Sequence, residues 1–335
     1  MKKITLKVIA DILGVSQTMV SRALSDKYGV SEDMRVKIRL TALDLGYLPS
    51  DKIKKAKSNA ITVVINRYDF NDNKFYLKLI ESIEREINIK KMSLLLNIVD
   101  NGNDNIPHSI AYKKTDGIIV MGRITSAHFS KFLGFSVPMV LLDTPEYYNN
   151  VDIVYANNFY GAYEATNYII KHGHKRIAFI GSPDFAFSFS ERLRGYLACA
   201  EQYKSSGITA FHTTASYDGY EIPYSVEEAK KILSPANGIT AVVCANDPVA
   251  LLIYKIAAEM GLYVPQDISV IGFDDVPNTE QIQPKLTSVK IYKSELGKLA
   301  LDILIKRINN PDLPYTYTQL STDIVERESV IFNLR

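Results

Sequence analysis

Apolar residues near the start of the chain recur at the spacing of two short helices. The first set falls three and four positions apart and predicts one buried helix face: Leu6, Ile9, Ala10 and Leu13. Gly14 is predicted to end this helix in a left-handed conformation. Ser16 is predicted to cap the next helix by accepting a hydrogen bond from its free backbone N–H groups.

The second predicted helix has an apolar inner face and a polar outer face. Val20 and Leu24 form the inner face. The outer face carries side chains that hydrogen-bond base edges or phosphates in a major groove: Gln17, Thr18, Ser21 and Arg22. We therefore predict a DNA-binding helix-turn-helix domain over residues 1–49, against the alternative of an ordinary helical hairpin.

A third helix and a basic segment follow. Ser31 is placed to begin the helix, which is predicted to run to Gly46, and a lysine-rich stretch occupies residues 51–57. Residues 1–57 hold 12 Lys and Arg against 6 Asp and Glu, whereas the remaining chain holds 27 against 31. This polarity favours a partner rich in phosphate. For the lysine stretch alone, a solvated surface is an equally good interpretation.

The rest of the chain alternates short apolar runs with helical stretches, which predicts an α/β body of parallel strands. The predicted strands are Ala60 to Ile65, Ser93 to Ile98, Gly117 to Met121, Met139 to Leu142, Arg176 to Gly181, Ala241 to Ala245 and Ser269 to Phe273. Met1 leads into an amphipathic helix, and no apolar run reaches the roughly 18 residues of a membrane span. We expect a cytoplasmic protein without a membrane partner.

The residues that carry chemistry argue against an enzyme or a metalloprotein. Neither a G-x-S-x-G elbow, a P-loop nor a G-x-G-x-x-G loop after a strand is present, and no cofactor is predicted. Cys199 and Cys244 are expected to be buried thiols. His172 and His174 lack a third ligand, so they indicate a turn before a strand and no metal site.

Two adjacent acids end one of the predicted strands. Side chains of neighbouring strand residues point in opposite directions, so Asp274 and Asp275 do not form a catalytic pair. Asp274 instead lies at the carboxyl end of a parallel strand, where open α/β sheets bind ligands. A carboxylate there accepts strong hydrogen bonds from sugar hydroxyls.

Ordered sequence blocks throughout the chain resemble the lactose-repressor/galactose-repressor (LacI/GalR) family of bacterial transcription regulators. In the first 49 residues they are Thr5-Leu6, Ala10, Gly14-Val15-Ser16, Val20-Ser21-Arg22, Val30-Ser31 and Tyr47-x-Pro49. In the body they include Asp116-Gly117, Asn157-Asn158, Arg192-x-x-Gly195-Tyr196, Asn246-Asp247, Gly272-Phe273-Asp274-Asp275 and Leu286-Thr287-Ser288-Val289.

The resemblance implies a domain organisation. A hinge would occupy residues 50–59, and residues 60–335 would form a two-lobed, periplasmic-binding-protein-like body of doubly wound parallel sheets. The first lobe is expected at about 60–158 and 289–318, and the second at about 159–288 and 319–335, with three crossings of the chain between them. An effector would bind in the cleft between the lobes, and the protein would form a homodimer.

The same resemblance implies residues that contact the effector and the DNA. In the second lobe these are Arg192, Asn246 and Asp274, and in the first lobe Phe75, Arg123 and Asp143, although Phe75 is equally a core candidate. Phe185, Phe187 and Phe189 are better interpreted as core than as a sugar platform. DNA contacts are expected from Thr5, Ser16, Gln17, Thr18, Ser21, Arg22, Lys54, Lys55 and Ala56.

One hinge position departs from the family. Ala56 stands where the family has a leucine that wedges into the minor groove, and a methyl group is too small to unstack a base step. We therefore expect weak bending of the DNA unless Ile53 takes that role, with Lys54 and Lys55 binding phosphates.

Together these observations predict a sequence-specific repressor of carbohydrate-use genes that a sugar releases from its operator, with galactosides as a first guess. Alternatives with the same DNA role are a corepressor such as a purine, or a phosphoprotein partner. A sugar-binding transport receptor or a carbohydrate enzyme would be an alternative of another class.

Overall fold

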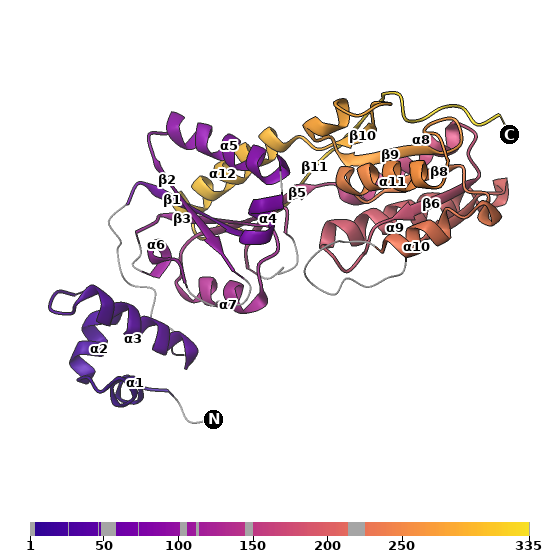
Figure 1. Cartoon of the computed structure of the whole chain (residues 1–335). Coiled ribbons are helices and arrows are strands. Elements are labelled where there is room, and N and C mark those ends of the chain that lie inside the picture. Colours follow the sequence, from indigo (N-terminus) through magenta and orange to yellow (C-terminus); the bar gives the residue numbers. More distant parts are fainter. Residues whose placement is uncertain are drawn as a thin grey trace.

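The computed structural model describes residues 4–25, 27–45, 47, 58–72, 74–100, 106–111, 114–144, 150–213 and 225–334. Within them, a small helical head precedes two sheets that lie one after the other (Figure 1). We call the first sheet with its helices the first lobe, and the second sheet with its helices the second lobe.

The head consists of α1 (Leu6–Leu13), α2 (Gln17–Leu24) and α3 (Glu32–Asp44). Gly14 ends α1 with a φ of 65°, and the Ser16 hydroxyl accepts a hydrogen bond from the Met19 N–H. Both predicted helix ends are therefore confirmed. The three helices bury one apolar cluster, made of Ile9, Ala10, Val20, Ala23, Leu24, Ile38 and Ala42.

The first lobe contains a six-stranded sheet in the order β11-β5-β4-β3-β1-β2, and all of its strand pairs are parallel. Its strands are β1 (Ala60–Asn66), β2 (Ser93–Val99), β3 (Gly117–Met121), β4 (Met139–Leu142), β5 (Asp152–Ala156) and β11 (Tyr317–Leu320). The central strands β1, β3 and β4 are buried along their whole length, so helices cover both faces of the sheet.

The second lobe repeats this plan in the order β12-β10-β9-β8-β6-β7, with β12 as an antiparallel edge. Its strands are β6 (Arg176–Ile180), β7 (Thr209–His212), β8 (Ala241–Cys244), β9 (Ser269–Asp274), β10 (Thr287–Lys290) and β12 (Asp323–Val325). Over the described residues the chain passes between the sheets three times: after β5, after β10 and after β11. The two parallel sheets confirm the predicted α/β fold class.

Helices separate the strands in both lobes. The first lobe holds α4 (Arg67–Asp72), α5 (Lys74–Ile89), α6 (His108–Ala111), α7 (Ser126–Gly134) and α12 (Lys293–Asn309). The second holds α8 (Asn158–Lys171), α9 (Phe187–Gln202), α10 (Val226–Ile232) and α11 (Asp247–Glu259). Although α12 follows β10 of the second sheet, it packs on α5, β3, β4 and β5 of the first (Figure 1).

The head touches the first lobe through α3. Arg39 Nη1 donates a hydrogen bond to the Ala111 carbonyl oxygen at 3.1 Å, and Arg39 itself is buried. Val36 and Leu40 pack against the apolar cluster of the first lobe that contains Ile110. The head therefore rests on the end of α6, next to which it lies in Figure 1.

Two further observations concern the chain as a whole. No helix over the described ranges is both long enough and apolar enough to cross a membrane. Cys199 and Cys244 are buried free thiols, as predicted, and burial raises the pKa of both.

Candidate effector site and DNA-binding face

The six predicted effector contacts come from the carboxyl ends of strands and from two helices. Asp274 ends β9, Asn246 follows β8 and caps α11, and Arg192 lies in α9. In the first lobe Asp143 follows β4, Arg123 follows β3 and Phe75 lies in α5. Because both sheets are parallel, these ends meet at one edge of each sheet, where α/β proteins bind ligands.

Arg192 is the central cation of the second lobe, with only 3% of its surface exposed. Its Nη2 lies 3.0 Å from Asp274 Oδ1, its Nε donates to Asn158 Oδ1 at 2.9 Å, and its Nη1 donates to the Ala245 carbonyl oxygen at 2.6 Å. The guanidinium also lies 3.8 Å from the centroid of the Phe273 ring. These partners fix the plane of the guanidinium before any ligand binds.

A glycine one turn further along α9 explains how Arg192 reaches α8. A Cβ atom at Gly195 would lie 2.1 Å from the Phe159 carbonyl oxygen, so only glycine allows the two helices to approach this closely. Asn158, the first residue of α8, is thereby brought within hydrogen-bond distance of Arg192. The Arg192-x-x-Gly195 spacing therefore serves the geometry of the site.

Asp274 is held in an unusual backbone conformation. Its φ is 103° and that of Asp275 is 52°, values that side-chain-bearing residues rarely adopt. The two carboxylates point to different partners, Asp274 to Arg192 and Asp275 to Arg327 at 2.7 Å. Asp274 Oδ1 is buried, and its approach to Arg192 lacks the geometry of a hydrogen bond. Burial raises the pKa of Asp274, while the charges of Arg192 and Lys293 oppose that shift.

Asp143 brings a second carboxylate to the same place from the first lobe. Its φ is 60°, and its Oδ1 is buried without a hydrogen-bond partner. Burial raises its pKa to about 7, the positive charge of Arg192 opposes the rise, and the negative charges of Asp274 and Asp69 add to it. Charges of the second lobe therefore act on the Asp143 carboxyl of the first lobe, and the two sets of predicted contacts form one electrostatic unit.

Arg123 is paired within the first lobe. Its Nε and Nη2 lie 3.0 and 2.9 Å from Asp69 Oδ1, and its backbone N–H donates to Asp69 Oδ2 at 2.6 Å. The guanidinium stacks on Tyr68 of the first lobe and on Phe185 of the second. Arg123 thus occupies the boundary between the lobes.

The remaining predicted contacts, Asn246 and Phe75, have structural roles in their lobes. The Asn246 side chain accepts a hydrogen bond from the Val249 N–H, which caps α11. Phe75 is buried and belongs to the core, and Lys293 Nζ lies 5.7 Å from its ring centroid. Phe189 is buried, in line with its interpretation as core.

Several residues of this unit escaped the sequence analysis: Asp69, Tyr76, Asn158 and Lys293. Burial raises the pKa of Tyr76, and the charges of Asp69, Asp143 and Asp274 raise it further. Asn158 lies in one of the recognised sequence blocks, which was a usable signal. Asp69 and Lys293 stand outside any such block.

The polar face predicted to read DNA is exposed on the head. Gln17, Thr18, Ser21 and Arg22 are exposed along α2, while Val20, Ala23 and Leu24 are buried beneath them. Thr5 is also exposed, one residue before α1. The hinge residues Lys54, Lys55 and Ala56 lie outside the described residues.

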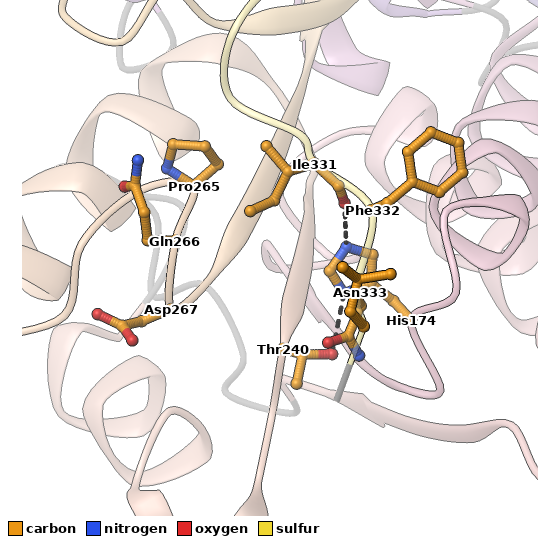
Figure 2. Close-up of a pocket in the computed structure, with 9 residues that line it drawn as sticks. His174, Thr240, Pro265, Gln266, Asp267, Ile331, Phe332 and Asn333 are labelled. Atoms are coloured by element: carbon orange, nitrogen blue, oxygen red, sulfur yellow. Dashed lines mark hydrogen bonds between the residues drawn. The ribbon is translucent and has the colours of Figure 1, made fainter.

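A pocket of about 150 Å³ in the second lobe lies at the other edge of its sheet. Figure 2 shows His174 between Thr240 and Ile331, which contact its Nδ1 and Nε2, each at 3.0 Å. Since a carbonyl oxygen only accepts, Nε2 carries the proton, and burial lowers the pKa of His174. The lining residues precede β6, β8 and β9 or belong to the segment 331–334 after β12, so the pocket is separate from the strand ends that carry Asn246 and Asp274. Within the described ranges, no group of His, Cys, Asp and Glu side chains is arranged to hold a metal ion.

The sequence of the chain is similar to a known domain family and to known transcriptional repressors. A family model described as a periplasmic binding protein-like domain matches residues 166–330. The chain is 30% identical to the ribose operon repressor of Escherichia coli K12 over 97% of its own length and 99% of that protein. It is also 30% identical to the HTH-type transcriptional repressor PurR of Vibrio atlanticus, over 97% of its length and 98% of that protein.

Two solved structures share the fold over nearly the whole chain. The transcriptional regulator CelR–cellobiose complex has a TM-score of 0.69 and 23% identity, covering 98% of this chain and 100% of the other. The lac repressor dimer bound to operator and an anti-inducer has a TM-score of 0.65 and 21% identity, with the same coverage.

Proposed function

Since the chain belongs to the LacI family of transcription regulators, we propose that it represses genes for the use of a carbohydrate and that a sugar bound between its lobes releases it from operator DNA. Like these relatives, it is a transcriptional repressor and not an enzyme. The observation that carries the proposal is the buried Arg192–Asp274 ion pair beside Asp143, at the junction of the lobes.

The chemistry of that unit supports a neutral polyhydroxy ligand. Asp143 and Asp274 each have a buried carboxylate oxygen that lacks a hydrogen bond. Sugar hydroxyls would donate to these oxygens, and Arg192 and Asn246 would hold acceptor oxygens of the same ligand. We assign Arg123 and Phe75 to the border of this effector site.

The head supports a dimer that reads two half-sites. Gln17, Thr18, Ser21 and Arg22 are the proposed base and phosphate contacts, with Thr5 and Ser16 at the two helix starts and Lys54, Lys55 and Ala56 in the hinge. A single head covers one half-site, so two chains would bind a two-fold operator one helical turn apart. We place the lobe boundaries between β5 and α8, between β10 and α12 and between β11 and β12, within a few residues of the expected 158, 289 and 319.

Operator affinity with and without ligand tests the proposal. D-ribose, cellobiose, a galactoside and a purine base would each be titrated against the full-length protein on operator DNA in a fluorescence anisotropy assay. The proposal expects one of the sugars to weaken operator binding by at least about fivefold. Tighter binding with the purine base and no response to any sugar would establish a corepressor mechanism instead.

Calorimetry on two variants tests the site assignment. Asp274→Ala is expected to retain operator binding and lose the heat of sugar binding, which leaves a permanently repressing protein. Asp312→Ala is a matched control because it removes an exposed acid between α12 and the amino end of β11. Equal sugar affinity in the parent and in Asp274→Ala would contradict the assignment.

A further inference from the structure

Lys293 connects the strained backbone at Asp274 with the first lobe. The ammonium group donates hydrogen bonds to the carbonyl oxygens of Asp274 and Asp275, the latter at 3.2 Å. It also lies 3.5 Å from the carbonyl oxygen of Ile291. Two of the three acceptors therefore belong to the residues with positive φ values of 103° and 52°.

The position of Lys293 is unfavourable for helix stability. It is the first residue of α12, where the aligned peptide dipoles already place positive charge. Burial lowers the pKa of its ammonium group, whereas the charges of Asp274, Asp247 and Asp275 raise it. A partly buried ammonium at the first position of a helix costs free energy unless hydrogen-bond acceptors compensate its charge. The carbonyl oxygens supply that compensation, so they explain a lysine at this position better than helix capping does.

The backbone of Lys293 moves with the first lobe. α12 packs on α5 so closely that a Cβ atom at Gly297 would lie 2.9 Å from the Leu79 carbonyl oxygen. Leu296, Leu301 and Leu304 are buried in the same packing. On this side the ammonium lies 5.7 Å from the centroid of the Phe75 ring. The backbone of Lys293 therefore belongs to the first lobe, whereas its ammonium group donates hydrogen bonds to the second lobe.

The second lobe holds the same loop with its own groups. Arg192 pairs with the Asp274 carboxylate, Arg327 pairs with that of Asp275, and the Asp275 N–H donates to the Ser288 hydroxyl at 3.2 Å. These partners all lie in the second lobe and move with the loop. Of these cations, only Lys293 projects from a helix that packs on the first sheet.

We propose that Lys293 is a positioning residue that couples the orientation of Asp274 to the arrangement of the lobes. The inference rests on the proposed function, in which Asp274 contacts the effector. Its ammonium keeps both carbonyl contacts only at the present separation of the lobes. A ligand that shifts the backbone of Asp274 also moves the carbonyl oxygens of Asp274 and Asp275, and Lys293 transmits that shift to α12. The converse holds as well, since coupling between two sites is reciprocal.

The test compares Lys293→Met with Lys298→Met. Both remove one positive charge from α12, but Lys298 is exposed. Labels on cysteines introduced at Arg85 of α5 and Lys255 of α11, both exposed, report the distance between the lobes. Since Cys199 and Cys244 are buried, the introduced thiols react selectively. Mixing labelled with excess unlabelled protein leaves one labelled chain per assembly.

Without any ligand, Lys293→Met is expected to shift or broaden the distance distribution, whereas Lys298→Met matches the parent. Lys293→Gln keeps a hydrogen-bond donor for the carbonyl oxygens without the charge, so its distance distribution should lie between those of the parent and Lys293→Met. If Lys293→Met does not fold, Lys293→Gln takes its place in the comparison. With the sugar that acts on the parent, the ratio of operator affinities without and with sugar should fall by about fivefold or more in Lys293→Met.

Distance distributions that are the same in Lys293→Met and Lys298→Met would overturn the inference. This comparison needs no effector. It therefore still decides the role of Lys293 if no sugar acts on the parent, in which case the proposed function fails separately.

Discussion

The guanidinium of Arg123 stacks on the ring of Phe185, with its central carbon 4.0 Å from the ring centroid. Arg123 follows β3 of the first lobe, and Phe185 precedes α9 of the second. Tyr68 of the first lobe lies on the same cation at 4.4 Å, and Asp69 fixes the guanidinium by hydrogen bonds. A cation–π contact therefore joins the lobes and is lost when they separate.

Phe185→Ala removes the second-lobe half of this contact. A cation–π interaction contributes about 0.5–2 kcal/mol, which corresponds to a change of roughly 2-fold to 30-fold in the equilibrium between lobe arrangements. Small-angle X-ray scattering of the ligand-free protein should show more separated lobes. Phe332→Ala, which removes an exposed ring stacked on His172, is the control. An unchanged scattering curve for Phe185→Ala would show that the contact does not hold the lobes.

Arg192→Met should be strongly destabilising. It leaves the Asp274 carboxylate buried beside no cation of its own lobe, and such an unpaired buried charge costs about 3–5 kcal/mol. Urea unfolding of the full chain measures this cost. Adding Asp274→Asn to Arg192→Met should recover part of the lost free energy, because the uncompensated charge is then absent. Strictly additive effects of the two substitutions would contradict a direct charge interaction.

Asp143 should make stability depend on pH. The unfolded carboxyl binds a proton only below about pH 4, whereas burial raises its folded pKa to about 7. Between these values the folded state binds more protons, so the free energy of unfolding falls as the pH rises from about 4 to about 7 and then levels off. Asp274 and Asp247, whose pKa values burial also raises, contribute with the same sign.

Asp143→Asn should therefore flatten part of that profile. Unfolding free energies from urea titrations at pH 5, 6, 7 and 8 would be compared for parent and variant. The asparagine does not titrate, so the fall in stability over this range becomes smaller. If the two profiles run parallel, Asp143 is already ionised at pH 5 and its burial has no energetic consequence.

Ser16→Ala should loosen the second helix of the head. The Ser16 hydroxyl accepts from the Met19 N–H at 3.1 Å, and loss of such a cap costs about 1 kcal/mol. Amide hydrogen exchange over α2 in the full-length protein should accelerate about fivefold. Ser25→Ala, at the other end of the same helix, should leave the exchange rates near those of the parent. Equal acceleration in both variants would exclude a specific role for the cap.

The hydrophobic pattern predicted the described strands whose residues are all buried, which are β1, β3, β4, β8 and β9. It missed β5 and β10, which are buried over most of their length. Every residue of β1 and β9 is buried, and both strands consist mainly of apolar residues. The sequence analysis did not identify β11, which alternates exposed and half-buried residues over four positions at a sheet edge. Its pairing with β5 joins residues more than 160 positions apart, as between Leu320 and Ala156, and no local pattern reveals such a partner.

The site was predictable where a side chain follows a buried strand. Asp274 was identified by its place at the end of β9, and Arg192 by the family motif around it. Asp69 was not, because the reason for its position is Arg123, 54 residues further along the chain. Lys293 is similar, because its hydrogen-bond acceptors are backbone carbonyl oxygens. Every residue has such an oxygen, so the sequence does not show which residues will accept from Lys293.

Because the proposed effector residues lie at strand ends, their position affects how the specificity of this protein can change in evolution. Buried strands such as β8 and β9 supply the core, whereas Asp274 is the last residue of β9 and Asn246 follows β8. Substitution at such positions alters what the regulator recognises while most of the packing stays intact. The exception is Arg192, whose buried contacts hold the lobe together and also belong to the proposed effector site. New effector specificities should therefore arise through substitutions around a retained arginine. Such substitutions change the effector that the repressor binds, and each intermediate protein still folds.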